Sequence, residues 1–222
     1  MALTKFNFNS FDVTSAASKG LGFNASANGF STIDPGAMTL IKTLTASSSS
    51  TLSFVDGSSS VVLDNTYSVY MFKFINIHPA TDGVAFQFNL SADSGSNYNV
   101  TKTTTNFGTF QNEGGSETFL GYDTDRDLAQ STSSQTLFSN GVMGNGNDES
   151  TSGQLILFSP SDTTFVKHFM SVVNYYNYGN YTINSYVAGY GNTTSAVDAI
   201  QFSMSSGNID SGTIKLYGIK DS

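Results

Sequence analysis

The chain has 222 residues and is acidic, with 17 Asp and Glu against 9 Lys and Arg and a formal net charge of -8. Nucleic-acid-binding proteins normally show a basic face, so this balance argues against DNA or RNA as a partner. The absence of cysteine excludes disulfides, thiol nucleophiles and cysteine-based metal sites, while 21 Gly, 18 Phe and 11 Tyr favour strands and turns over helices.

The first 37 residues predict an N-terminal arm or leader. Met1–Ala37 carries five phenylalanines among Ser, Asn, Ala and Gly, and Ser15–Gly29 has neither helical nor strand periodicity. Apolar side chains gain roughly 25 cal/mol per Å² on leaving water, so we expect these rings to be buried, either on a partner subunit or over the chain's own main domain. The assembly residues so predicted are Phe6, Phe8, Phe11, Phe23 and Phe30.

Neither a signal peptide nor a membrane span is predicted. The first residues, MALTKFNFNSF, contain no uninterrupted apolar core, and no run approaches the roughly 20 apolar residues of a membrane helix. We therefore expect synthesis in the cytoplasm of the producing cell without membrane insertion.

The main domain is predicted at residues 38–222, after the Pro35-Gly36 pair. Short apolar or alternating runs between turn residues indicate nine or ten strands, and hence an all-β, two-sheet antiparallel β-sandwich of jelly-roll-like type. The runs are Met38–Thr45, Leu52–Val55, Tyr67–Ile77, Val84–Leu90, Val100–Phe107, Gln154–Phe158, Thr164–Val173, Ser185–Tyr190, Ile200–Met204 and Thr213–Ile219.

The stretch Tyr67–Leu90 predicts the centre of the fold. YSVYMFKFINI is apolar on both faces, as expected for a strand inside a sheet, and VAFQFNL alternates strictly, as expected for a half-buried strand. The intervening HPATDG supplies turn residues, so we expect one antiparallel hairpin. The predicted core residues are Phe72, Phe74, Phe86, Phe88, Phe202 and Leu216.

A long loop excursion is predicted at Asn112–Gly153, where Gly, Ser, Asn and Asp dominate, with one short helical turn at Asp125–Gln130. Asp123, Asp125 and Asp127 form a D-x-D-x-D spacing, in which alternate carboxylates can share a Ca²⁺ ion. The loop lacks the glycine and the final acidic residue of a helix-loop-helix calcium site. A solvated acidic turn is the alternative, and no cofactor is predicted.

No motif predicts catalysis. His78 and His168 have no accompanying G-x-S-x-G elbow, and structural roles fit both better than a catalytic triad does. Glu113, Glu117 and Glu149 leave glycoside hydrolysis by paired carboxylates open, although no pair is marked by its spacing. We therefore expect a protein that is not an enzyme.

The segment VNYYNYGNYTINSY, Val173–Tyr186, predicts a ligand-binding surface for a glycan or a partner protein. Exposed Tyr gives a flat apolar ring face and Asn gives paired hydrogen bonds, a combination typical of sugar-binding and protein-binding patches. Tyrosines packed at the rim of the sandwich are the alternative. The candidate residues are Tyr175, Tyr176, Tyr178, Tyr181, Asn177 and Asn180.

Two segments carry a resemblance to a known family. INIHPATDGVAFQFNLSADSGSNYNVT, Ile75–Thr101, and SSGNIDSGTIKLYGIK, Ser205–Lys220, resemble segments of virion structural proteins of tailed phages, especially phages of marine bacteria. In that family the GTIKLYGI pattern recurs as the last strand of a β-sandwich. The resemblance spans about Met38–Lys220 and brings no catalytic residue with it.

The resemblance implies a non-enzymatic virion protein, exposed on the particle as a head decoration or tail-associated subunit. Its partners would be other virion proteins and further copies of itself, most simply as a trimer. The alternative is a carbohydrate-binding or receptor-binding module of a tail fibre or tail tip, which would attach the phage to host surface glycans. The chain has no coiled-coil heptads, which favours a compact subunit over a full-length fibre.

Overall fold

The computed structural model describes residues 20–24, 26, 29–33 and 36–221, and all regular elements within them are strands. No helix in these ranges is long and apolar enough to cross a membrane. The strands are β1 (Gly20–Phe23), β2 (Phe30–Ile33), β3 (Met38–Thr45), β4 (Leu52–Val55), β5 (Val69–Pro79), β6 (Phe86–Ser91), β7 (Lys102–Asn112), β8 (Thr118–Tyr122), β9 (Gln135–Thr136), β10 (Thr151–Phe158), β11 (Lys167–Asn177), β12 (Tyr181–Gly191), β13 (Ala199–Met204) and β14 (Ile209–Ile219).

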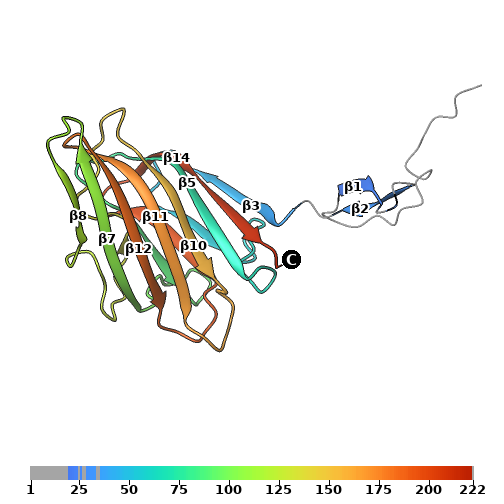
Figure 1. Ribbon diagram of the computed structural model, residues 1–222. Coiled ribbons are helices and arrows are strands. Elements are labelled where there is room, and N and C mark those ends of the chain that lie inside the picture. The colour runs from blue at the N-terminus through green and yellow to red at the C-terminus, as the bar shows by residue number, and fades with distance from the viewer. Residues whose placement is uncertain (1–19, 25, 27–28, 34–35, 222) are drawn as a thin grey trace, which may run out of the picture.

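Two antiparallel sheets pack face to face, which confirms the predicted β-sandwich (Figure 1). The larger sheet has eight strands in the order β3-β14-β5-β10-β11-β12-β7-β8, and the smaller has four in the order β4-β13-β6-β9. Strand β5 pairs with β14 on one side and β10 on the other, so it lies inside the large sheet, as its two apolar faces predict.

The core between the sheets is a cluster of phenylalanine rings around Phe202 of β13. Buried positions alternate with less buried ones along most of β5, β13 and β14, and in β6 Phe86 and Phe88 lie on either side of the less buried Gln87, so these side chains point inward. All six predicted core residues are at most 2% exposed, which confirms them. The rings whose centroids lie between 5.2 and 6.4 Å from that of Phe202 are those of Phe54, Phe72, Phe74, Phe86 and Phe88.

The predicted central hairpin is wrong. Strands β5 and β6 do not pair, because β5 belongs to the large sheet and β6 to the small one. The segment between them crosses from sheet to sheet, and their side chains meet across the core, where Phe74 and Phe86 pack edge to face at 5.2 Å. A turn-rich connection of this length is compatible with either path, so the sequence did not distinguish them.

The excursion at 112–153 is more ordered than predicted. Strand β8 within it pairs with β7 and forms one edge of the large sheet, while β9 pairs with β6. The expected helical turn at 125–130 is absent, since those residues form turns and bends. Strands β11 and β12 are also longer than predicted, and they meet in a tight hairpin in which Asn177 opposes Tyr181.

The N-terminal hairpin of β1 and β2 is drawn apart from the sandwich in Figure 1. Phe23 and Phe30 stack on each other at 5.3 Å and remain 72% and 42% exposed. The predicted assembly residues Phe6, Phe8 and Phe11 lie outside the described residues. An isolated two-stranded hairpin is only marginally stable in water, so this one gains from packing on a further surface.

Lys102 of β7 is a buried cation. Its side chain is 0% exposed, and its Nζ donates hydrogen bonds to Asn89 Oδ1 and, at 2.9 Å, to the Val100 carbonyl oxygen. Burial disfavours the charged form and lowers the lysine pKa from 10.5 to about 8. The unfolded chain therefore binds more protons than the folded one between these two values, and folding stability rises with pH in that window.

We expect the free energy of unfolding of the parent, relative to that of a Lys102→Met variant, to increase by about 2 kcal/mol from about pH 7.5 to about pH 9.5. The cost of burying the charge is fully present below pH 8 and vanishes above the unfolded pKa. Urea titrations of both proteins at the two pH values measure this difference. A difference that does not change with pH would show that burial does not lower the pKa of this lysine.

Candidate functional site

The predicted tyrosine and asparagine patch lies at the hairpin that joins β11 to β12. Two of its members are buried, which corrects their assignment to the surface. Tyr175 is 0% exposed, donates a hydrogen bond to the Ser139 carbonyl oxygen at 2.6 Å and stacks on Phe138 at 3.9 Å. Burial raises its pKa. Asn177 is 6% exposed.

Asn177 holds the hairpin in place instead of facing solvent. Its Nδ2 donates to the Val142 carbonyl oxygen at 2.7 Å, and its Oδ1 accepts from the Gly179 backbone N–H at 2.7 Å. Both side-chain groups are therefore engaged. Asn180, at a positive φ of 63°, accepts a hydrogen bond from the Tyr176 hydroxyl at 2.9 Å, so these two residues also brace the turn.

The two remaining tyrosines, Tyr178 and Tyr181, do reach the surface. Tyr178 at the tip of the hairpin is 62% exposed. Tyr181 is half-buried, with its ring edge-on to Phe110 at 5.3 Å and its hydroxyl donating to Glu117 Oε2 at 2.7 Å. The hydrogen bond to Glu117 is the main reason that the pKa of Tyr181 is raised.

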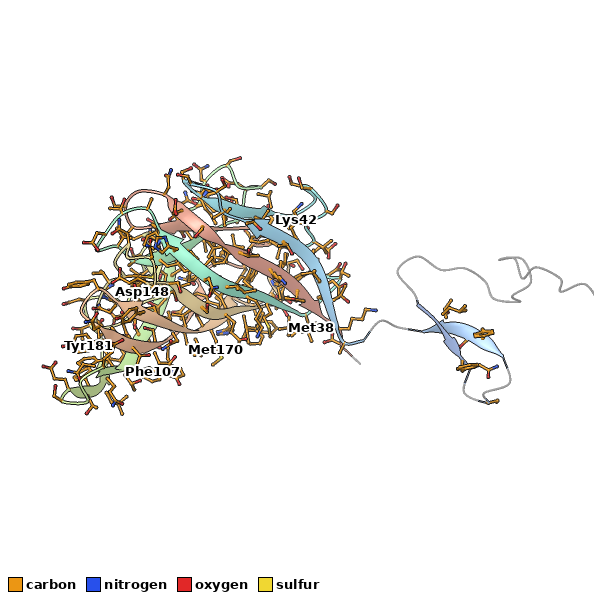
Figure 2. All side chains as sticks on the ribbon, turned by 90° about the horizontal axis from the view of Figure 1, so that it is seen from above. Met38, Lys42, Phe107, Asp148, Met170 and Tyr181 are labelled. Atoms are coloured by element: carbon orange, nitrogen blue, oxygen red, sulfur yellow. The ribbon has the colours of Figure 1, made fainter. Side chains whose placement is uncertain are left out.

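A pocket of about 260 Å³ opens beside these two tyrosines. Figure 2 places Tyr181 at one end of the sandwich and Met38 at the other. The N-terminal hairpin lies on the Met38 side. The walls combine aromatic rings, side-chain amides and one cation, on three separate parts of the chain. The lining residues are Phe110, Arg126, Asn140, Gly141, Val142, Asn177, Tyr178, Tyr181 and Ile183.

The polar side of the pocket is organised by Asp123. Its Oδ2 accepts the Asn140 backbone N–H at 2.7 Å and lies 3.4 Å from Arg126 Nε. These contacts fix the segment that carries both lining residues. The Asn140 side chain has a buried Nδ2 without a hydrogen-bond partner, which is costly unless a further acceptor reaches it.

The three aspartates of the D-x-D-x-D motif do not converge. Asp123 is engaged as above, whereas Asp127 Oδ2 accepts a hydrogen bond from the Tyr122 hydroxyl at 2.7 Å, and Asp125 is exposed. Across the described ranges, no group of three His, Cys, Asp or Glu side chains could hold a metal ion. The motif forms a hydrogen-bonded turn that positions the pocket wall.

The residues considered for catalysis have structural contacts. His78 Nε2 lies 3.0 Å from the Gly146 carbonyl oxygen, and His168 packs against Tyr190 with ring centroids 6.2 Å apart. Glu149 accepts the Gly146 backbone N–H at 2.5 Å. Within the part of the chain that the structure describes, neither histidine is hydrogen-bonded to a serine or threonine hydroxyl.

Sequence reasoning missed six of the nine lining residues, among them Phe110, Arg126 and Asn140. Phe110 lies on β7, and the other two lie in the excursion, 14 residues apart in the sequence. The one available signal was the excursion itself, because long loops commonly carry binding functions. Arg126, the single arginine of the chain, is a natural place to look within it.

Comparison with known proteins does not assign the chain to a group. No protein-family model, no curated protein and no solved structure matches it. The function is therefore argued from its residues and their geometry.

Proposed function

We propose that this chain is a non-enzymatic structural subunit of a tailed-phage virion, exposed on the particle as a head decoration or a tail-associated protein. The observation that carries the proposal is the aromatic hairpin beside the sandwich. The exposed and stacked Phe23 and Phe30 are well suited to docking on another subunit. In this reading β1 and β2 form part of an attachment arm.

The resemblance to virion proteins supports the same proposal. Its two segments, Ile75–Thr101 and Ser205–Lys220, contain the last five residues of β5, all of β6 and all of β14. They therefore include strands of both sheets that surround the core. The contacts of His78, His168 and Glu149 are structural, which also fits a non-catalytic subunit.

The test is localisation. Phage particles should be purified from the cells that carry the gene and examined by mass spectrometry, and by electron microscopy with gold-labelled antibodies against the recombinant chain. We expect the chain in the particles and the label at regular positions on the head or the tail. Purified particles that lack the chain would rule out a virion role.

A second candidate function is glycan binding at the pocket beside Tyr178. The pocket offers an exposed ring at Tyr178 and an edge-on pair at Phe110 and Tyr181, surfaces on which sugar rings stack. Asn140 Nδ2, which lacks a partner, could donate to a sugar hydroxyl after a small side-chain rotation. Such a site would let the particle contact host surface glycans.

We expect Tyr178→Ala to weaken binding to the best glycan on an array at least about tenfold, because the most exposed stacking surface is lost. Calorimetry with that glycan measures the change. Phe165→Ala is the matched control, since Phe165 is 69% exposed but does not line the pocket, and it should leave affinity unchanged. Equal losses in both variants would argue against this pocket.

A further inference from the structure

The outer face of the eight-stranded sheet carries an unbroken row of side chains at one register level. The row crosses seven strands from β3 to β7, and its members are apolar except for the final threonine. Leu40 and Met170 within it are 51% and 56% exposed. The row, called here the Met170 row, consists of Leu40, Tyr217, Met71, Ile156, Met170, Ala188 and Thr105.

A second row runs parallel to it and ends in aromatic rings. Phe107 and Tyr186 stack there at 4.9 Å with their planes 7° apart. Figure 2 shows Met38, Met170 and Phe107 along one side of the sandwich. This row, called here the Phe107 row, consists of Lys215, Lys73, Gln154, Val172, Tyr186, Phe107 and Tyr122.

The outer face is nearly free of carboxylates, although the protein is acidic. Asp210 is the single Asp or Glu in the eight strands of the large sheet, against 17 in the whole chain. The centre of a protein–protein interface is typically enriched in Met and aromatic residues and depleted in Asp and Glu. The face therefore differs from an ordinary solvated surface.

A hollow lies directly beside the protruding Met170. It measures about 440 Å³ and exists because β12 has only Ala188 and Gly189 at this level. Thr105 of β7 and Tyr190 of β12 also line it. A protrusion next to a hollow on one face is the arrangement that two identical copies can fill reciprocally.

We propose that this face is the interface of a two-fold symmetric homodimer, with the Met170 side chain of each copy seated in the hollow over Ala188 of the other. The axis runs along the strands, between β11 and β12. This inference does not depend on the virion proposal. It also differs from the trimer that the family resemblance implies.

Strand order gives an independent check through charge. An axis between β11 and β12 lays β5 of one copy over β8 of the other, because these strands are equally far from the axis. Within the Phe107 row, Lys73 then faces Tyr122, whose hydroxyl is bonded to Asp127. Neither Lys73 nor Lys215 has a carboxylate within salt-bridge distance among the described residues. The dimer supplies Lys73 with one.

An axis across the strands would instead place the two Lys73 side chains on the same strand pair, where like charges repel.

The area of the face is also sufficient for a stable dimer. The six strands from β5 to β8 that face each other across this axis, spaced by about 4.8 Å and about 30 Å long, cover roughly 860 Å² per copy, close to the ~800 Å² per partner of a standard interface.

Sedimentation equilibrium of the full chain tests the proposal. We expect a species of twice the 23.6 kDa chain mass. Met170→Asp should raise the dimer dissociation constant at least about 100-fold, because it buries an unpaired carboxylate in each copy. Met170 points away from the core, so the variant should keep the circular dichroism spectrum of the parent. Ser58→Asp, at an exposed residue in the loop that follows β4 of the smaller sheet, is the matched control and should leave the constant unchanged.

A charge exchange tests the axis. Lys73→Glu should raise the dissociation constant about tenfold, and the double variant Lys73→Glu with Asp127→Lys should restore it. A monomeric parent, a species of three chains, or a dimer that tolerates Met170→Asp overturns the proposed interface. Failure of the rescue overturns the axis. The localisation of the chain on phage particles is measured separately, so either proposal can fail alone.

Discussion

Replacing Phe202 with alanine is expected to lower the free energy of unfolding by about 3–5 kcal/mol, which is a large share of the stability of a domain. Phe202 is 0% exposed on β13, in the smaller sheet. Its ring contacts Phe72 and Phe74 of the larger sheet as well as Phe86 and Phe88 of its own. Truncation removes buried apolar surface and leaves a cavity between two sheets that strand pairing prevents from collapsing.

Urea denaturation of parent and variant measures this loss. Phe165→Ala serves as the control, because that ring is 69% exposed and should change stability by no more than about 0.5 kcal/mol. If the two variants unfolded at the same urea concentration, Phe202 would not be at the centre of the core.

Gly212→Ala is expected to cost about 3 kcal/mol or more, the second large effect. Gly212 has a φ of +114°, a conformation that residues with a side chain rarely adopt. An added Cβ would lie 2.5 Å from the Asn76 carbonyl oxygen and 2.7 Å from the Ile77 Cα, both backbone atoms of β5. The irregular register of β14 on β5 at this point depends on that close approach.

Gly115→Ala separates the two causes. Gly115 also has a positive φ, of +69°, but an added Cβ there meets nothing within 4 Å. This control should lose only the roughly 1–2 kcal/mol of backbone strain. Thermal or urea unfolding of both variants measures the difference, and equal losses would mean that β5 and β14 separate at no cost.

Much of the fold followed from local pattern. Period-2 alternation located the strands near Leu52, Gln154, Ile200 and Thr213, since each face of a strand meets a uniform environment. The pairing of those strands did not follow. HPATDG has the turn chemistry of a hairpin, yet the strands on either side of it hydrogen-bond to β14 and β13, which lie more than 100 residues later in the sequence. The sequence of a turn does not identify a partner strand that lies so far away in the chain.

The candidate site shows the same limit. Sequence reasoning ended the strand at Val173 and so treated Tyr175 as a surface residue, although the alternation continues through Asn177. A remote segment buries Tyr175: the Phe138 ring stacks on the tyrosine ring, and the Ser139 carbonyl oxygen accepts a hydrogen bond from the tyrosine hydroxyl. The pocket beside it likewise needs Arg126 from the excursion, and no spacing rule links that residue to the hairpin.

By itself the sequence determined that this protein is an all-β sandwich with an inward-facing set of phenylalanines, because burial of alternate apolar side chains is a local requirement of each strand. The tertiary structure alone decided which strands share a sheet, which tyrosines reach solvent and which face of the large sheet stays uncovered. All three features depend on contacts between segments that are far apart in the chain. The free energy of such a contact depends on how well the two segments fit once folding has brought them together. Met170 and Phe202 occupy similar positions in their strands, yet one is 56% exposed and the other is at the centre of the core.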